Sequence, residues 1–365
     1  MKALRIVHTE SSLGWGGQEI RILAESQGLI RRGHQVSLVC PPEARIFTEA
    51  RTWGVPAVGM PLAKKRLVGL RGLIEWFRAN RCDVVSSHSS TDSWLAALAL
   101  LTLGRPFPIV RTRHVSAPVP RNPWTRWLYT RAAARVVTTG ERLRRQLIDE
   151  NRFPAERIES VPTGVDAGRF RPGERAAARQ QLGLDSERSL VGIVATLRSW
   201  KGHRYLVEAL KALPESVALA IVGDGPQREA LAKRIGQLGL GRRVRMAGDQ
   251  ADVLPWLRAL DVFVLPSYAN EGVPQALVQA MLVGLPCVTT AAGGIPEIAE
   301  HERSALVVPP RDPAALAAAI ARLLADEGLR RELGTAARKH CVENCSYERM
   351  LERMEAIYRD AARAA

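Results

Sequence analysis

The chain lacks the features that mark disulfide-rich, zinc-binding or membrane-spanning proteins. Its five cysteines are scattered, odd in number and form no CxxC pair, which favours buried thiols over a disulfide framework or a zinc site. The longest apolar stretch, residues 94–103, is about half of the roughly 20 residues that cross a bilayer, so we expect a buried helix there. The first residues read as a strand and not as a signal peptide, which predicts a cytoplasmic protein.

The chain has fewer acidic than basic residues, and the difference is larger in its first half. The chain carries 52 Lys and Arg against 37 Asp and Glu, a net charge of +15. Residues 1–160 hold 25 of these cations and 13 of the acids, a net +12, which leaves +3 for the rest. A basic first half predicts an anionic partner: a membrane surface, a phosphorylated acceptor or nucleic acid. A solvated, arginine-rich surface without a partner is the alternative.

Length and hydrophobic pattern indicate two domains. A chain of 365 residues is longer than the chains that usually fold around a single hydrophobic core. Short Val- and Ile-rich runs alternate with amphipathic stretches, which is typical of βαβ units and parallel sheets. Strands are predicted over residues 4–8, 35–40, 84–87, 109–112 and 135–139, then over 190–195, 218–222, 244–247, 262–265 and 287–290. We therefore predict an α/β protein with two doubly wound Rossmann-like domains, residues 1–166 and 167–345, and a C-terminal helix over 346–365.

The second half carries the most informative motif. Glu271 precedes Gly272, Val273 and Pro274, and Pro274 is predicted to open a helix whose free N–H groups bind an anion. The Glu271 carboxylate can accept hydrogen bonds from vicinal sugar hydroxyls. Gln279 follows two helical turns along. An ordinary helix cap is the alternative for the carboxylate.

Cations and a glycine turn accompany this motif. Arg198 and Lys201 follow a predicted strand, and an arginine fork with a lysine point charge can offset a diphosphate without magnesium. Gly293 and Gly294 form a predicted turn, and Glu297 comes directly after it. Together these groups suit a ligand with both sugar hydroxyls and phosphates.

Two further features lie in the first half. Gly16 and Gly17 connect the first strand to the first helix, where glycine lets backbone N–H groups approach a phosphate or a sugar. His88 and His114 each end a strand on the same side, and a histidine there can donate to, or polarise, a sugar hydroxyl. A structural role is the alternative for each histidine.

Taken in order, these motifs resemble those of the retaining GT-B glycosyltransferases of the GT4 family, also called glycosyltransferase group 1. The resemblance covers nearly the whole chain. It rests on Gly16-Gly17-x-Glu19, His114 after a strand, Pro162-Thr163-Gly164-Val165-Asp166, Lys201-Gly202, Val222-Gly223-Asp224-Gly225-Pro226, Glu271-Gly272-x-Pro274 and Gly293-Gly294-x-Pro296-Glu297. It implies two Rossmann-like domains facing across a cleft, the second holding the nucleotide sugar and the first the acceptor, with a closing helix that crosses back to the first.

The family also implies a reaction and a set of site residues. The reaction is the transfer of a hexose, most commonly from a UDP-sugar, to an acceptor hydroxyl through an α-linkage, with no cofactor and no metal. Glu271 would bind hydroxyls of the donor hexose, and His114 would lie beside the transferred sugar; these are the implied catalytic residues. The implied donor-binding residues are Gly16, Gly17, Arg198, Lys201, Gly272, Val273, Pro274, Gln279, Gly294 and Glu297. The acceptor-side candidates are Glu19, His88 and Asp92.

Two positions depart from the family pattern. The second glutamate of the family's EX7E motif, which grips the nucleotide ribose, is Gln279 here, and an amide binds a hydroxyl without charge assistance. Many members carry arginine five residues before the lysine, where this chain has Thr196. Arg198 is two residues further on and is kept as a phosphate ligand.

The basic first half suggests what kind of surface presents the acceptor. Lys64-Lys65-Arg66 and residues 121–145, in which Trp124, Trp127 and Tyr129 alternate with arginines, suit an anionic lipid headgroup layer. No nucleic-acid-binding module accompanies them, so no nucleic acid partner is expected. We expect a glycan or glycolipid acceptor such as lipopolysaccharide core, and a peripheral position on the inner face of the cytoplasmic membrane. The alternatives are a GT-B-like nucleotide-sugar epimerase and a catalytically lapsed nucleotide-sugar-binding protein.

Overall fold

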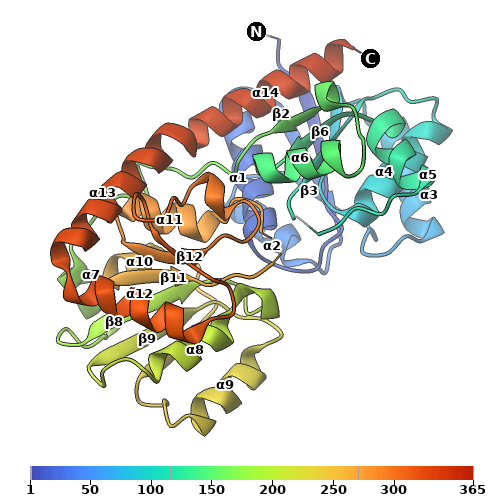
Figure 1. Ribbon diagram of the computed structural model, residues 1–365. Coiled ribbons are helices and arrows are strands. Elements are labelled where there is room, and N and C mark those ends of the chain that lie inside the picture. Colours follow the sequence, from blue (N-terminus) through green and yellow to red (C-terminus); the bar gives the residue numbers. More distant parts are fainter. Residues whose placement is uncertain (1, 116, 270, 365) are drawn as a thin grey trace. The chain divides into compact units, whose positions relative to one another are not determined.

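The computed structural model describes residues 2–115, 117–269 and 271–364. The chain forms two compact units, one made of Met1–Thr163 with Glu348–Ala365 and the other of Gly164–Tyr347 (Figure 1). Each unit is a parallel sheet flanked by helices. The alternating strand and helix pattern of the sequence predicts this architecture, and the predicted α/β fold is confirmed.

The first unit holds a seven-stranded sheet in the order β3-β2-β1-β4-β5-β6-β7. Its strands are β1 (Arg5–Thr9), β2 (Gln35–Cys40), β3 (Ala57–Gly59), β4 (Val84–Ser87), β5 (Ile109–Arg113), β6 (Ala133–Thr138) and β7 (Ile158–Ser160). Its helices are α1 (Gly17–Arg31), α2 (Arg45–Thr52), α3 (Leu67–Ala79), α4 (Ser90–Thr102), α5 (Pro123–Trp127), α6 (Glu141–Asp149), the π-helical η1 (Leu128–Ala132) and the 3₁₀ turn η2 (Ala155–Arg157).

The second unit holds a six-stranded sheet in the order β10-β9-β8-β11-β12-β13. Its strands are β8 (Ser189–Val194), β9 (Val217–Val222), β10 (Val244–Gly248), β11 (Val262–Leu265), β12 (Cys287–Thr290) and β13 (Leu306–Val308). Its helices are α7 (Arg175–Leu182), α8 (His203–Leu210), α9 (Arg228–Gln237), α10 (Leu254–Ala259), α11 (Gln275–Val283), α12 (Pro313–Ala325) and α13 (Glu327–Asn344), with 3₁₀ turns η3 (Ser199–Lys201) and η4 (Ile295–Glu297).

All ten predicted strands are present within two residues of their predicted bounds. Three strands were not predicted: β3, β7 and β13. Each has three residues and lies at the edge of its sheet, so it is too short to show a hydrophobic pattern. The predicted buried helix is α4, and no helix among the described residues is long and apolar enough to span a membrane.

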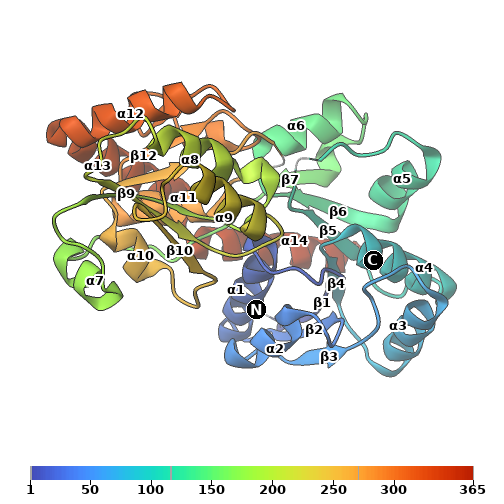
Figure 2. The same ribbon diagram turned by 90° about the horizontal axis from the view of Figure 1, so that it is seen from below.

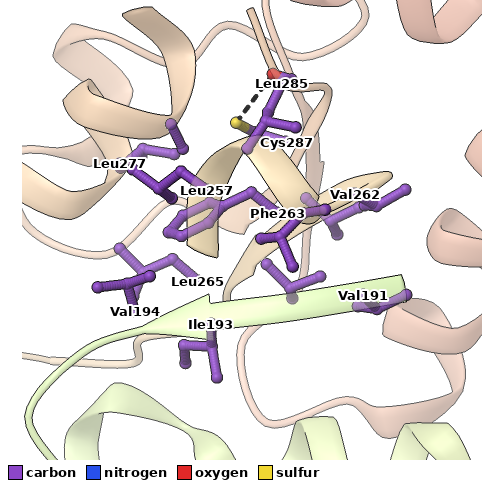
Figure 3. Packing of buried hydrophobic residues seen from close by; sticks show 14 of the residues in the cluster. Val191, Ile193, Val194, Leu257, Val262, Phe263, Leu265, Leu277, Leu285 and Cys287 are labelled. Atoms are coloured by element: carbon purple, nitrogen blue, oxygen red, sulfur yellow. Dashed lines mark hydrogen bonds between the residues drawn. The ribbon is translucent and has the colours of Figure 1, made fainter. Parts of the chain in front are cut away.

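Buried aliphatic side chains hold the second unit together (Figure 3). Val191 of β8 is the register partner of Val262 of β11, and Gly192 is that of Phe263. The side chains of Val191, Ile193, Val262 and Phe263 are each at most 1% exposed. Burial of one such side chain stabilises a fold by about 1.5–3 kcal/mol. The centre of this sheet is therefore rigid, and the loops that leave its strands start from fixed points.

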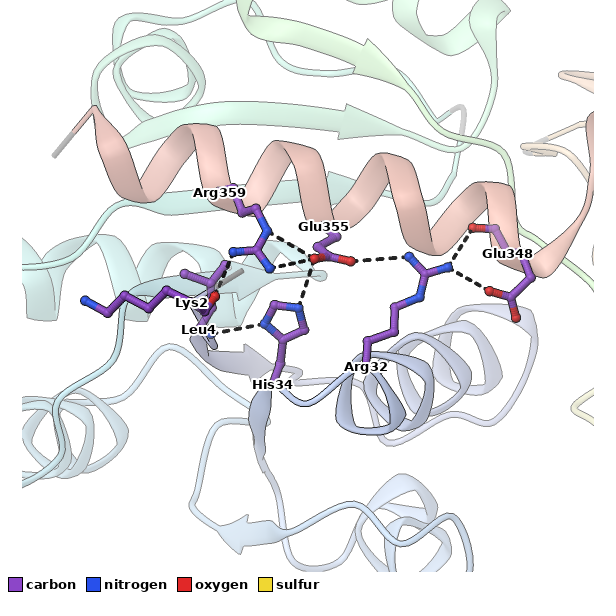
Figure 4. Close-up of polar contacts among 7 residues, drawn as sticks. All are labelled: Lys2, Leu4, Arg32, His34, Glu348, Glu355 and Arg359. Atoms are coloured by element: carbon purple, nitrogen blue, oxygen red, sulfur yellow. Dashed lines mark hydrogen bonds and ion pairs between the residues drawn. The ribbon is translucent and has the colours of Figure 1, made fainter.

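The last helix, α14 (Tyr347–Arg363), packs on the first unit from Glu348 onward. Its buried side chains recur at helical spacing, at Met350, Leu351, Met354, Ile357, Tyr358 and Ala361. Ion pairs border this stripe (Figure 4). Arg32 contacts Glu348 at 2.7 Å and Glu355 at 3.3 Å, and Arg359 holds Glu355 at 2.7 Å while donating to the Lys2 carbonyl.

Beneath that border, Tyr358 takes part in a fully buried polar contact. Its hydroxyl donates to Glu25 Oε1 at 2.5 Å and lies 2.9 Å from Ser86 Oγ. Arg21 lies 3.7 Å from the other carboxylate oxygen of Glu25 and donates to the Val161 carbonyl at 2.8 Å. Burial raises the pKa of Glu25 and lowers that of Arg21. The helix is thus fastened to the sheet by a specific hydrogen bond as well as by apolar contact.

We expect the substitution Tyr358→Phe to lower the free energy of unfolding by about 1.5–3 kcal/mol, because it leaves a buried carboxylate oxygen without its hydroxyl donor. Urea denaturation measures this change. The matched control is Glu352→Gln, at an exposed position of the same helix. Equal midpoints for Tyr358→Phe and the control would contradict the assigned contact.

Candidate active site

Loops of the second unit meet beyond the carboxyl ends of its strands. The strand order reverses between β8 and β11, which is where open α/β sheets bind ligands. Glycine is required there by close packing: a Cβ on Gly202 (φ +78°) would lie 2.1 Å from the Pro266 carbonyl oxygen. The Tyr268 N–H donates to the Trp200 carbonyl at 2.8 Å and joins the β8 and β11 loops.

Glu271 lies between these two loops and is 5% exposed. Lys201 Nζ is 2.6 Å from Glu271 Oε1, and Ser267 Oγ donates to the same oxygen at 2.7 Å. Among the described residues, these are the two side chains that hydrogen-bond this carboxylate, and both contact Oε1. The structure thus brings together two residues that are 70 positions apart in the sequence.

The predicted double-glycine turn packs directly on Glu271. Gly293 has a φ of 56°, and a Cβ there would lie 2.1 Å from the Glu271 carbonyl oxygen. The Gly294 N–H donates to that same oxygen at 3.2 Å. Three loops therefore fix the backbone and the side chain of one carboxylate.

The helix after Glu271 starts one residue later than expected. It begins at Gln275, and Pro274 precedes it with an extended ψ of 119°. The Pro274 carbonyl accepts the N–H groups of Leu277 and Val278, which leaves those of Gln275 and Ala276 at the open helix end. Gly272 and Val273 are buried, and Gln279 is on the same helix with 9% exposure.

One predicted donor residue lies outside this arrangement: the Arg198 guanidinium lies over the Trp200 ring at 5.7 Å and has no hydrogen bond to Glu271. Glu297 is half-buried at the end of the 3₁₀ turn η4, and its N–H donates to the Gly294 carbonyl at 3.1 Å. The sequence does not predict Ser267, because a lone serine after a strand gives no sign of its hydrogen-bond partner.

In the first unit, three histidines form a row across neighbouring strands. His8 Nδ1 is 2.9 Å from His88 Nε2, and His88 Nδ1 is 3.0 Å from His114 Nε2. Burial lowers the pKa of His8 to about 3 and lowers those of the other two well below their usual value. All three imidazoles are therefore neutral near pH 7. His8 was not predicted, because it lies inside an apolar strand.

Buried carboxylates lie next to this row. Asp92 is fully buried and accepts from Thr9 Oγ1 at 3.0 Å and from the N–H groups of His88 and Ser89 at 2.9 Å. These contacts cap α4, which indicates that Asp92 holds the loop. Glu10, also buried, was not predicted.

Glu10 is held by donors from its own loop, from α1 and from the residue that caps α4. It accepts from the N–H groups of Ser11 and Ser12 at 2.7 Å, from Gln18 Nε2 at 2.6 Å and from Ser89 Oγ. Burial raises its pKa to about 8.

Gly16 and Gly17 lie where the same loop meets the first helix. Gly16 is extended, with a φ of 177°, and α1 begins at Gly17. Glu19 is in the first turn of this helix and is 5% exposed.

Comparison with known proteins decides the family. Residues 15–169 match the sequence profile described as "Glycosyltransferase Family 4", and residues 174–340 match "Glycosyl transferases group 1". A D-inositol 3-phosphate glycosyltransferase of Salinispora arenicola is 31% identical over 78% of this chain and 70% of its own length. The chain belongs to the glycosyltransferase group 1 family.

Further relatives of this glycosyltransferase agree. A D-inositol 3-phosphate glycosyltransferase of Xylanimonas cellulosilytica is 29% identical over 88% of this chain and 87% of its own length. The fold matches that of Anabaena Alr3699/HepE in complex with UDP and glucose, with a TM-score of 0.87, 21% identity and coverage of 97% and 98%. It also matches WaaG, a glycosyltransferase involved in lipopolysaccharide biosynthesis, with a TM-score of 0.75, 18% identity and coverage of 96% and 99%. The GT-B fold of this glycosyltransferase is thereby confirmed.

We expect Gly293→Ala to destabilise the second unit by about 1–3 kcal/mol, because alanine has to adopt a left-handed conformation against the Glu271 carbonyl. Urea denaturation measures the loss. Gly241→Ala is the matched control, since a Cβ at Gly241 meets nothing within 4 Å. A loss no larger than that of the control would show that the turn does not need glycine.

His8 should make this glycosyltransferase sensitive to acid. Its pKa is about 3 in the fold and about 6.5 in an unfolded chain, so its contribution to stability is lost as the pH falls below about 6.5. Between pH 7 and pH 5, His8→Phe should therefore lose about 2 kcal/mol less than the natural chain. Urea midpoints at the two pH values test this. Val137→Ala, a buried substitution in the same sheet, should lower stability without changing its pH dependence.

Proposed function

We propose that this glycosyltransferase moves a hexose from a UDP-sugar to a hydroxyl of a glycan or glycolipid acceptor, with retention of configuration at the anomeric carbon. The Lys201–Glu271 pair at the β8/β11 switch point carries the proposal. It offers a cation for a diphosphate and a carboxylate oxygen for sugar hydroxyls within one rigid group of loops. The UDP complex of a protein with the same fold supports the choice of donor.

In the proposed reaction, Glu271 Oε2 accepts hydrogen bonds from hydroxyls of the donor hexose. Lys201 Nζ and the free N–H groups at the start of α11 stabilise the charge that develops on the leaving diphosphate. Arg198 would have to leave the Trp200 ring to join them. No metal is required, and EDTA should leave the rate unchanged.

The other predicted donor-binding residues are proposed to position the diphosphate, the ribose and Glu271. Gly272, Val273 and Pro274 shape the backbone beside the diphosphate, and Gly294 fixes Glu271. Glu297 is assigned to the same turn. Gln279 contacts the ribose as a neutral amide, and Gly16 and Gly17 approach the diphosphate with their backbone.

His114 is proposed to contact the transferred sugar. A neutral imidazole can donate one hydrogen bond and accept another, so it can orient a hydroxyl without adding charge. His88 fixes the His114 ring through the 3.0 Å contact between them. Glu19 stays a candidate on the acceptor side, whereas the buried contacts of Asp92 favour a role in the fold.

We expect Glu271→Gln and His114→Ala each to lower kcat/KM about 100-fold or more while the fold is retained, since each removes a group that acts on the reacting sugar. Product formation followed by NMR also reports the anomeric configuration. Glu187→Gln, an exposed position, serves as the control. Turnover near that of the control would remove the substituted residue from the active site.

The acceptor is proposed to be presented at an anionic membrane surface, as for a lipopolysaccharide core. Leu67, Val68 and Trp124 are 70%, 58% and 74% exposed, and Lys64 and Arg66 stand next to the first two. The similarity of the fold to WaaG, a glycosyltransferase involved in lipopolysaccharide biosynthesis, supports a lipid-linked acceptor, and the D-inositol 3-phosphate glycosyltransferases among the relatives support a phosphorylated one. Tyr129, which the sequence places among the interface aromatics, is 3% exposed and stacks on Phe153, whereas Trp127 is half-buried and stacks on Trp94.

We expect the double substitution Lys64→Gln with Arg66→Gln to weaken binding to phosphatidylglycerol vesicles about 30-fold, from about 1 kcal/mol per basic residue. Co-sedimentation at low salt measures this. Arg331→Gln with Lys339→Gln, in α13, is the matched control for net charge. An equal loss of vesicle binding in the two double variants, or no vesicle binding by the natural chain, would contradict a specific membrane-binding surface.

A further inference from the structure

A pocket of about 320 Å³ in the first unit is lined by residues of α4, β5, α5 and η1, among others. Figure 2 shows the ribbons of α4, β5 and α5. The volume of the pocket falls in the range of about 300–1,000 Å³ of small-molecule sites. Three of its lining residues are cations, Lys65, Arg111 and Arg113, and none is acidic. Trp94 and Trp124 add aromatic surface.

Arg111 is the most informative of these residues. It is 4% exposed, and its guanidinium lies over the Tyr129 ring at 4.5 Å. Its Nε and Nη1 atoms are buried and have no hydrogen-bond partner among the described residues. Burial raises the pKa of Asp92 to about 6, and the charge of Arg111 acts against this rise, but no ion pair joins the two within the described part of the chain. A buried guanidinium that lacks hydrogen-bond acceptors is costly, so the site favours an anion.

Neighbouring groups point to the same ligand charge. Arg113 follows Arg111 by two residues on β5, so both side chains lie on one face of the sheet. Its guanidinium donates to the Ala117 carbonyl, while its Nε has no partner among the described residues. Ser90, the first residue of the 13-residue helix α4, also lines the pocket and brings the positive end of that helix to it.

The aromatic walls are suited to a sugar ring. Trp94 stacks on Trp127 with an interplanar angle of 23°, and Lys65 Nζ lies 5.6 Å from the Trp94 ring centre. Trp124 is 74% exposed. Indole faces supply rigid apolar surface at little entropic cost, which suits the C–H face of a saccharide.

We propose that this pocket binds a saccharide that carries a phosphate or a carboxylate, with the anion on Arg111 and Arg113 and the sugar ring against Trp94 and Trp124. The assignment of this saccharide as the acceptor rests on the function proposed above. Two residues that line the pocket are close in sequence to the histidine row: Arg113 directly precedes His114, and Ser90 follows His88 by two residues.

Calorimetry without donor tests the pocket by itself. The probes are myo-inositol 1-phosphate and glucuronate, with myo-inositol, glucose and inorganic phosphate for comparison. We expect the charged sugars to bind at least about tenfold more tightly than the neutral ones, from the strength of hydrogen bonds to charged groups. If inorganic phosphate binds as tightly as inositol phosphate and Trp124→Ala changes neither affinity, the claim that the pocket binds a sugar ring is wrong.

Arg111→Gln should weaken binding of the charged sugars about 10- to 100-fold. Because Arg111 is buried, Arg113→Gln and Trp124→Ala test the same site at less buried positions, and circular dichroism checks each fold. Arg126→Gln, at an exposed arginine of α5 outside this pocket, is the control. Unchanged affinity in all three pocket variants would overturn the proposal.

UDP-glucose binding by the same variants separates the two proposals. If charged sugars bind and UDP-glucose does not bind the natural chain, the pocket stands and the donor assignment fails. If UDP-glucose binds and no charged sugar does, the pocket assignment fails. When both bind, Arg113→Gln should raise the KM for a phosphorylated acceptor about tenfold and leave UDP-glucose affinity unchanged.

Discussion

The ion pair between Lys201 and Glu271 is the interaction around which the loops of the second unit are arranged. A carboxylate that is 5% exposed needs a cation and hydrogen-bond donors to offset the loss of its hydration. The pair forms because β8 and β11 are neighbours, so residues that follow each strand meet at one edge of the sheet. Gly202 and Gly293 then let the loops close on it without a Cβ in the way.

The first unit uses charge differently. Its strand ends carry neutral imidazoles and enclosed carboxylates, whereas Arg111, whose Nε and Nη1 have no hydrogen-bond partner among the described residues, lines the pocket beside α4 and α5. The neutral imidazoles can therefore orient a hydroxyl, whereas the charged Arg111 can attract an anion. Tyr358 connects this arrangement to the C-terminal helix, because its hydroxyl lies 2.9 Å from Ser86, whose Oγ is 3.4 Å from His88.

The sequence predicts most of the fold, because long buried strands carry a clear hydrophobic pattern, but three-residue edge strands do not. That Lys201 and Glu271 come together follows from the same pattern, since both come after strands of one sheet. Ser267 and Glu10 could not be found this way, because only the folded loops bring their partners within reach. The interface position expected for Tyr129 was wrong, since that side chain is 3% exposed and stacks on Phe153.

Equilibrium binding of UDP-glucose to the natural chain and to Lys201→Gln tests the central claim most directly. We expect the natural chain to bind and the variant to bind at least about tenfold more weakly, because a charge-assisted contact to the diphosphate is lost. Glu187→Gln should bind like the natural chain. Equal affinity of the natural chain and Lys201→Gln would contradict the claim that the ion pair marks the donor site.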